Sequence, residues 1–287
     1  AADALGKIGS ESAVWALAGA LVERRLSPWA RENAAKFLGK IGSQKAVTEL
    51  ALVMSDQSEE SPIRLCAAES LRKVDSDEAR AFKREVVMAL MALMHPSEEY
   101  WVQARAAESL GMIGSEAEVA VQALTVVLRE PETDIAIRVP AADALGKIGS
   151  ESAVWALAGA LVERRLSPWA RENAAKFLGK IGSQKAVTEL ALVMSDQSEE
   201  SPIRLCAAES LRKVDSDEAR AFKREVVMAL MALMHPSEEY WVQARAAESL
   251  GMIGSEAEVA VQALTVVLRE PETDIAIRVP AADALGK

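Results

Sequence analysis

The sequence predicts an all-α fold, a right-handed α-solenoid (α-α superhelix) of about eight helical hairpins. Two observations lead to this prediction. A short motif recurs every 33 to 39 residues, and such periods are typical of solenoids that stack one hairpin on the next. The composition is 50% apolar but only 4% aromatic, which favours closely packed helices over sheets. Whether the array stays open, closes into a ring or stacks end to end is left open by the sequence.

The chain contains the same sequence twice. Residues 1–147 and 141–287 are identical, at an offset of 140 residues. We therefore expect a first four-hairpin block at 1–140, an identical second block at 141–280, and the start of a further repeat at 281–287. Folding does not require identity at solvent-facing positions, so the copy indicates either a very recent duplication or an engineered chain.

Each copy contains four unlike hairpins. Pairs of alanines begin similar stretches at Ala1-Ala2, Ala34-Ala35, Ala67-Ala68, Ala106-Ala107 and Ala141-Ala142. We assign these stretches to the first helix of each hairpin, helix A. Glycine ends helix A at Gly9, Gly42 and Gly114, because glycine adopts the left-handed conformation that closes a helix. The turn to the second helix, helix B, is therefore short.

Serine and threonine are expected to cap the helices, since their hydroxyls accept hydrogen bonds from free N–H groups. The expected caps of helix A are Ser27, Ser61, Ser97 and Thr133, and those of helix B are Ser10, Ser43, Ser76 and Ser115. Ser115 with Glu118 has the spacing of a capping box. Pro140 lies inside a helix A and is expected to kink it.

Helix B should bury one face against helix A. Val14, Leu17 and Leu21 share that face, and the later hairpins repeat the spacing. The third hairpin has seven extra residues, which are two helical turns and should extend helix B without turning its buried face. The fourth hairpin has two extra residues, which the turn should absorb.

These residues resemble HEAT repeats, most closely the HEAT-like repeats of phycobilisome-lyase-type proteins. In that pattern an arginine precedes the alanine pair, as do Arg31, Arg64 and Arg138 here, whereas Gln103 departs from it. The resemblance covers essentially the whole chain and implies about eight HEAT-like hairpins. It says little about function, because such repeats serve many roles.

No catalytic, cofactor-binding or metal-binding residue is predicted, and the chain is expected not to be an enzyme. Deoxyhypusine hydroxylase, of the same repeat family, binds iron through His-Glu pairs, but this chain has no such dipeptide. Its histidines, His95 and His235, should lie at the ends of B helices. Cys66 and Cys206 should be packed, inert thiols. The connector carboxylates, Glu59-Glu60, Glu98-Glu99, Glu130 and Glu132, should be solvated.

Charge and composition limit the partners. The net charge of −10 is poorly suited to nucleic acid, whose affinity comes mostly from Lys and Arg. No window of 18 uncharged apolar residues occurs, so no membrane span is expected. One cysteine per copy indicates reduced thiols and a cytoplasmic protein.

An outward stripe on the B helices is the candidate binding surface. Trp15 points away from the buried face, and its counterparts lie at the same position of the later B helices or one turn further on. The stripe consists of Trp15, Thr48, Leu52, Met88, Gln122 and Val126, repeated as Trp155, Thr188, Leu192, Met228, Gln262 and Val266. In HEAT arrays the B helices line the concave surface, so the resemblance implies a groove for a protein or peptide. The alternative is that the stripe packs against neighbouring helices or another chain. Trp29 and Trp101 are expected to seal gaps between hairpins.

The sequence thus favours a non-catalytic scaffold for protein binding or self-assembly. The chain begins and ends within a helix A without a polar capping repeat, so we expect its ends to meet, in a ring or between molecules in a filament. Two alternatives stay open: a bilin-lyase-like protein that handles a chromophore, and a sensor module of a larger signalling ATPase.

Overall fold

A computed structural model describes residues 2–8, 10–130, 132–253, 259–270 and 273–286, and all regular elements in these ranges are helices. The chain forms two compact units, Ala1–Ile148 and Gly149–Lys287, which are considered separately. The boundary between the two sequence copies, after residue 140, lies inside the helix Ile135–Ile148. The two units thus divide at the end of that helix, and not at the boundary between the two sequence copies.

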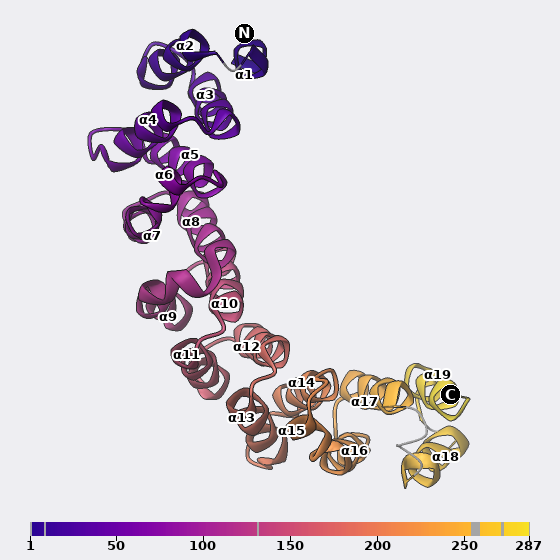
Figure 1. Ribbon diagram of the computed structural model, residues 1–287. Helices are drawn as coiled ribbons and strands as arrows, with labels where there is room; N and C mark the ends of the chain where they lie inside the picture. Colours follow the sequence, from indigo (N-terminus) through magenta and orange to yellow (C-terminus); the bar gives the residue numbers. More distant parts are fainter. Residues whose placement is uncertain (1, 9, 131, 254–258, 271–272, 287) are drawn as a thin grey trace. The chain divides into compact units, whose positions relative to one another are not determined.

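The first unit is a row of hairpins followed by one further A helix. Its elements are α1 (Ala2–Ile8), α2 (Glu11–Val22), α3 (Pro28–Ile41), α4 (Gln44–Ser55), α5 (Ser61–Arg72), α6 (Asp77–Arg80), α7 (Lys83–Ala92), α8 (Tyr100–Ile113), the 3₁₀ helix η1 (Gly114–Ala120), α9 (Val121–Arg129) and α10 (Ile135–Ile148). Within this unit the A helices α3, α5, α8 and α10 form one layer and the B helices α2, α4, α7 and α9 form the other (Figure 1).

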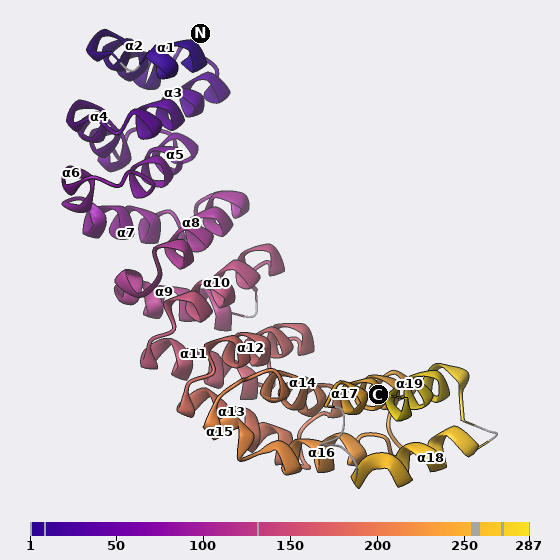
Figure 2. The same ribbon diagram turned by 45° about the vertical axis from the view of Figure 1, so that its right-hand side comes forward.

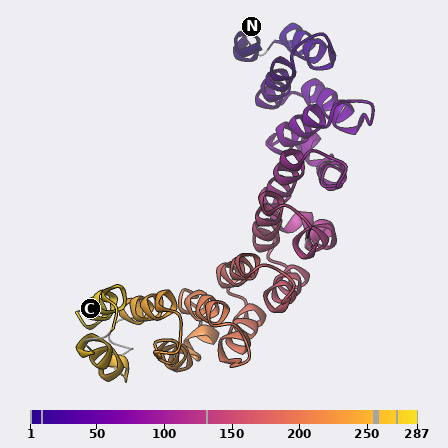
Figure 3. The same ribbon diagram turned by 180° about the vertical axis from the view of Figure 1, so that it is seen from behind.

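The second unit has the same two layers. Its elements are α11 (Glu151–Val162), α12 (Pro168–Ile181), α13 (Gln184–Ser195), α14 (Ser201–Arg212), α15 (Asp217–Arg220), α16 (Lys223–Ala232), α17 (Tyr240–Ile253), α18 (Val261–Arg269) and α19 (Ile275–Leu285). Seen from behind, the B helices α13, α16 and α18 again lie on one side of the A helices α12, α14, α17 and α19 (Figure 3).

The core lies between the layers and consists of small and branched residues. The alanine pairs from Ala34-Ala35 to Ala246-Ala247 are buried, as are Val14, Leu17 and Leu21 of α2. Consecutive A helices approach closely because they present small residues to each other. A Cβ added at Gly111 of α8 would lie 2.7 Å from the Cα of Ala144 in α10, so only glycine fits there. The predicted buried face of the B helices is confirmed.

The predicted caps are partly right. Ser10, Ser27, Ser43 and Ser76 each accept a hydrogen bond from a backbone N–H three residues later. Gly42 closes α3 with a φ of 61°. Gly9 lies outside the described residues.

Four other predicted caps are wrong. Glu60 and Glu99 precede α5 and α8 without a side-chain cap, so Ser61 and Ser97 cap neither helix. Asp134, not Thr133, caps α10, its carboxylate accepting from the N–H of Ala136 at 2.8 Å.

The fourth cap failure is the box expected at Ser115 and Glu118. The two extra residues of this hairpin are absorbed in η1, so helix B begins only at Val121. Gly114, with a φ of 74°, starts this tighter segment.

The third hairpin also differs from expectation. Its seven extra residues do not lengthen helix B by two turns. They form the four-residue helix α6 and a break at Ala81-Phe82 before α7 (Figure 2). Arg80, beside the break, is held by Asp75 and Asp77, with N–O distances of 2.6 and 2.7 Å. Both ion pairs lie within residues 75–80, in α6 and the turn that leads into it.

A buried arginine joins consecutive hairpins. The side chain of Arg31 on α3 is 1% exposed, and its Nε donates to the carbonyl of Leu21, in the last turn of α2, at 2.8 Å. Its Nη2 donates to Glu59, in the connector between α4 and α5. One guanidinium therefore fixes the end of one B helix, its own A helix and the approach to the next hairpin.

The same arrangement recurs along the chain. Arg171 donates to the carbonyl of Leu161 at 2.8 Å and pairs with Glu199. Arg204 and Arg278 likewise donate to a carbonyl ten residues earlier, at 3.4 and 3.1 Å. Gln103, which departs from the arginine pattern, donates to the carbonyl of Glu98 at 2.8 Å. The helix C-termini carry carbonyls that lack partners within their own helix, and the arginines supply donors to them, whereas Gln103 donates to a connector carbonyl.

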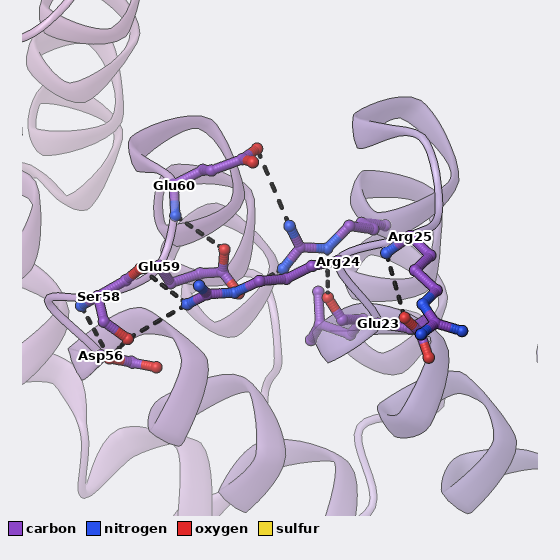
Figure 4. A network of polar contacts seen from close by, with 9 residues as sticks. Glu23, Arg24, Arg25, Asp56, Ser58, Glu59 and Glu60 are labelled. Carbon is purple, nitrogen blue, oxygen red and sulfur yellow. Dashed lines mark hydrogen bonds and ion pairs between the residues drawn. The ribbon is translucent and has the colours of Figure 1, made fainter.

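The connectors are tied to each other at the surface as well (Figure 4). Arg24, after α2, donates to the carbonyl of Ser58, after α4, at 2.9 Å. The hydroxyl and N–H of Ser58 donate to Asp56 at 2.8 and 2.9 Å. These two hydrogen bonds hold the pKa of the Asp56 carboxyl below its ordinary value. Glu59, expected in solvent, is instead 8% exposed, because its carboxylate lies on the buried Arg31 and accepts the N–H of Glu60 at 2.8 Å.

The exchange of Glu59 for alanine should cost the first unit about 3–5 kcal/mol, because it leaves the Arg31 charge buried without its partner. Glu60→Ala is the matched control. It removes the same charge one residue later, from a side chain that is 58% exposed and 3.9 Å from Arg31, and should cost about 1 kcal/mol at most. Urea unfolding followed by circular dichroism measures both. Equal losses of stability would contradict a structural role for the buried pair.

The equivalent pair should also make stability depend on acid pH. Burial alone would raise the pKa of Glu199, but hydrogen bonds from Arg171 and from the N–H of Glu200, with the charges of Arg171 and Arg164, outweigh it and lower that pKa. A carboxyl with a depressed folded-state pKa stabilises the fold above its unfolded pKa, about 4.3, and loses that contribution as the pH falls through the folded value. The difference in urea midpoint between wild type and Glu199→Ala should therefore be constant from pH 7 to 5 and shrink below about pH 4. A difference independent of pH down to 3 would contradict this.

Candidate protein-interaction surface

The predicted stripe lies on the solvent side of the B-helix layer in each unit. Trp15, Thr48, Leu52, Met88, Gln122 and Val126 in the first unit, and Trp155, Thr188, Leu192, Met228, Gln262 and Val266 in the second, are all exposed. We call each set of six the B-face of its unit. The apolar members are more than half exposed, from 53% for Met88 to 61% for Leu52 and Val126.

Helical spacing explains why these side chains face outward. In α4, Val47, Leu50 and Met54 pack against the A layer, and Thr48 and Leu52 are four residues apart on the opposite side. The Thr48 hydroxyl donates to the carbonyl of Gln44 in its own helix at 3.0 Å, so this position offers mainly its methyl group to solvent. The B-face is therefore predominantly apolar.

Neighbouring B helices meet at the tryptophan. The Lys45 ammonium, on α4, lies 4.0 Å from the centroid of the Trp15 ring on α2, within the range of a cation–π interaction. Lys45 also pairs with Glu49 at 2.5 Å. In the second unit Lys185 lies 3.7 Å from the Trp155 ring. Trp15 thus has a packing partner on the next helix, yet 56% of it is exposed.

Sequence reasoning missed the lysine. Thirty residues separate Trp15 from Lys45, and only the register between two hairpins brings them together. The length of the connector between them does not by itself give the rotation of one helix against the next.

A glycine widens the open area beside Trp15. Gly19 lies one turn further along α2, and a Cβ built there would meet no atom within 4 Å. Gly159 is equally open in the second unit. Within the part of each unit that the structure describes, no packing contact therefore requires glycine at this position, although glycine in a helix interior lowers stability.

The expectation that Trp29 seals a gap between hairpins is wrong. Trp29 is 75% exposed and its copy Trp169 is 40% exposed. Both lie in the first turn of an A helix, on the side opposite Leu38 or Leu178, which face the core. Trp101 is partly buried. Its Nε1 donates to Glu99 and Arg105 lies 5.9 Å from its ring.

The remaining chemistry-bearing side chains have structural surroundings. Cys66 is buried, and its thiol donates to the carbonyl of Glu32 at 3.4 Å. Burial raises the pKa of this thiol to about 11, so the predicted inert thiol is confirmed. His95 is exposed, and its Nδ1 accepts the N–H of Ser97 at 3.2 Å. Within the described ranges no three His, Cys, Asp or Glu side chains gather as metal ligands would.

One stretch, Tyr100–Arg129, is long and apolar enough to cross a membrane by length and composition. The structure divides it among α8, η1 and α9. The positive φ of Gly114 and the non-helical backbone of Ala117 interrupt it. It belongs to a hairpin rather than to a single straight helix.

Comparison with known proteins shows which fold this is. A family model of HEAT repeats matches residues 87–165. A crystal structure of Kap121p bound to Pho4p superposes with a TM-score of 0.70 at 13% identity, over 96% of this chain and 33% of Kap121p. Kap121p bound to the extreme C-terminus of the phosphatase Cdc14p gives a TM-score of 0.62 at 11% identity, over 95% of this chain and 37% of that karyopherin. The fold is an all-α solenoid with HEAT repeats, as predicted.

The chain spans about a third of the length of the karyopherin that it resembles. Human deoxyhypusine hydroxylase, in complex with glycerol, aligns over 98% of both chains at 20% identity, with a TM-score of 0.36. No curated protein sequence matches the chain.

The open glycine positions beside Trp15 and Trp155 provide a direct test of this surface. Replacing Gly19 and Gly159 by alanine should stabilise each unit by about 0.5–1 kcal/mol, because alanine loses less backbone entropy in a helix and meets no neighbour. Thermal unfolding measures the change. As a control, Gly111→Ala should destabilise, since its Cβ would clash with the backbone of Ala144. A loss of stability in Gly19→Ala would show that another group occupies this space.

Proposed function

We propose that the chain is a non-catalytic scaffold whose B-faces bind a protein or peptide partner. The observation that carries this proposal is the row of apolar side chains, one position per B helix, that remains more than half exposed after each unit has folded. Contiguous exposed apolar area is unfavourable in water and commonly marks an interaction site. A partner that buries it would gain about 25 cal/mol for each Å² covered.

The fold supports the same proposal. Kap121p, which shares this arrangement of helices, is found bound to Pho4p and to the C-terminus of Cdc14p. Those complexes belong to Kap121p. They support the proposal because they show that such an array of helical hairpins can hold a protein segment.

The shape of the B-face favours a partner with an apolar side. Trp15 offers a flat aromatic surface beside the open position Gly19, where a partner backbone can approach closely. Lys45, next to the ring, is already paired with Glu49, so little net charge is presented there. We infer that the partner contributes aliphatic or aromatic side chains, as the apolar face of an amphipathic helix does.

The duplication makes this surface bivalent. Each unit carries the same six B-face residues in the same local structure. A partner with two copies of its own motif would bind both, with a gain from effective concentration rather than from new contacts. A chain with one unit should then bind such a partner much more weakly than the full chain.

Peptide selection from a displayed library tests the proposal. Peptides selected on the full chain should lose about tenfold or more in affinity when Trp15 and Trp155 are replaced by alanine, since buried aromatic anchors dominate such interfaces. Trp29→Ala with Trp169→Ala is the matched control, because it removes two exposed tryptophans from the A helices, and affinity should be unchanged. Isothermal titration calorimetry measures both. An equal loss in the two variants, or no enrichment of any peptide, would contradict the proposal.

Self-assembly is the other form of the same scaffold role, with a second copy of the chain as the partner. Sedimentation of the chain alone distinguishes the two cases. A mass above that of the monomer which returns to the monomer in Trp15→Ala with Trp155→Ala would assign the B-face to self-association. A monomer at all concentrations would leave the surface to a different partner.

A further inference from the structure

The irregular third hairpin encloses a cavity at the edge of the first unit. It has a volume of about 290 Å³ and lies among the ends of α5 and α8, the short helix α6, the start of α7, and η1. The same cavity is present in the second unit, where the described residues enclose about 160 Å³. It shares none of its lining residues with the B-face.

The seven extra residues create this cavity. Ala79 and Arg80 of α6 and Lys83 and Val86 of α7 form one of its walls. If helix B were continuous through these positions, as the sequence suggested, α6 would not stand apart from α7. Insertions in repeat arrays often form their binding sites, and here the insertion supplies both a wall and charged side chains.

Arg72, at the C-terminal end of α5, is the unusual residue in the cavity. Its Nε is buried and has no hydrogen-bond acceptor among the described residues. Its Nη2 donates to the sulfur of Met112 at 3.2 Å, and a thioether is a weak acceptor. Arg212 has the same buried Nε without an acceptor and the same contact, to Met252 at 3.3 Å. Each guanidinium therefore lacks a strong acceptor in the described structure.

The other cations around the cavity already have carboxylate partners. Arg80 pairs with Asp75 and Asp77, and Lys83 pairs with Glu116 at 2.6 Å. Glu69, one turn before Arg72 on α5, is taken up by Arg105 at 2.5 Å. Burial lowers the pKa of the Arg72 guanidinium, and the charge of Glu69 opposes that shift. Among the described residues around the cavity, Arg72 is thus the one cation without a carboxylate of its own.

We propose that this cavity binds a small monocarboxylate, either free or at the C-terminus of a peptide, with its carboxylate on Arg72 and its apolar stem against the cavity wall. An arginine fork matches a carboxylate and holds it by charge-assisted hydrogen bonds. The carboxylate replaces the Met112 sulfur on the guanidinium, and Met112, which is 57% exposed, moves aside into solvent. With a single cation left over, the site suits one negative charge better than a phosphate dianion.

The walls set the size and character of the stem. Leu71, Val74, Val86 and Ile113 line the cavity beside Arg72. A volume of about 290 Å³ is at the lower limit of small-molecule sites, which fits a branched stem of a few carbons. Because the two copies are identical in sequence, two ligands should bind per chain.

The experiment is a titration of the full chain with isovalerate, followed by NMR and calorimetry, beside its neutral analogue isovaleramide. Isovalerate should saturate two sites with a Kd on the order of millimolar. The affinity of isovaleramide should be lower by a factor of about ten or more. Acetyl-Ala-Ala-Leu with a free carboxylate distinguishes the sources. Tighter binding of this peptide than of isovalerate assigns the site to peptide C-termini, and equal or weaker binding assigns it to free carboxylates. Equal affinity for isovalerate and isovaleramide would overturn the proposal. A failure of both isovalerate and the peptide to saturate the sites would also overturn it.

Two pairs of variants isolate the role of the arginine. Arg72→Gln with Arg212→Gln should reduce isovalerate affinity about tenfold or more. Arg25→Gln with Arg165→Gln removes the same charge from exposed positions outside the cavity and should leave affinity unchanged. Met112→Glu with Met252→Glu gives each arginine a carboxylate in cis. It should raise the melting temperature and abolish isovalerate binding, a result that does not depend on the folding of the glutamine variants. Unchanged binding in Met112→Glu with Met252→Glu would overturn the proposal.

Discussion

The buried guanidinium of Arg31 is the interaction on which the stacking of hairpins depends. It donates to the end of the preceding B helix and pairs with a carboxylate that leads to the next hairpin. Apolar packing between A helices is non-directional and by itself leaves neighbouring hairpins some freedom of register. A directional set of donors removes this freedom, since an alternative register would leave a buried charge without acceptors. The arginine therefore selects one register, and the hydrophobic core supplies most of the stability.

The separate roles of the arginine hydrogen bonds and of the apolar core explain why the two layers have different surfaces. The A helices use small residues to approach one another, as Gly111 does with Ala144, and the arginines extend from them to the connectors. The B helices need only one buried face, so their outward positions are not constrained by folding. Trp15, Leu52 and Met88 occupy such positions. The B-face can thus vary in sequence without loss of the fold.

The sequence predicted well whatever depends on short-range periodicity. The alanine pairs, the buried valines and leucines of the B helices and the outward direction of Trp15 all follow from 3.6 residues per turn. The sequence did not predict the contacts that join separate hairpins. Glu59 was assigned to solvent because a connector carboxylate is usually exposed, and only the position of Arg31, 28 residues earlier, shows otherwise. Trp15 and Lys45 are a second case, because their contact depends on the rotation between two helices.

The third hairpin shows a different limit of periodicity. Seven residues are two turns of a helix, so arithmetic favoured a longer helix B, yet the helix breaks at Ala81-Phe82, after the single turn of α6. The break separates α6 from α7 and opens the cavity that exposes the poorly satisfied guanidinium of Arg72. The cavity thus comes from the irregular third hairpin, and a solenoid of regular hairpins would lack it. Both units carry the same departure and the same cavity.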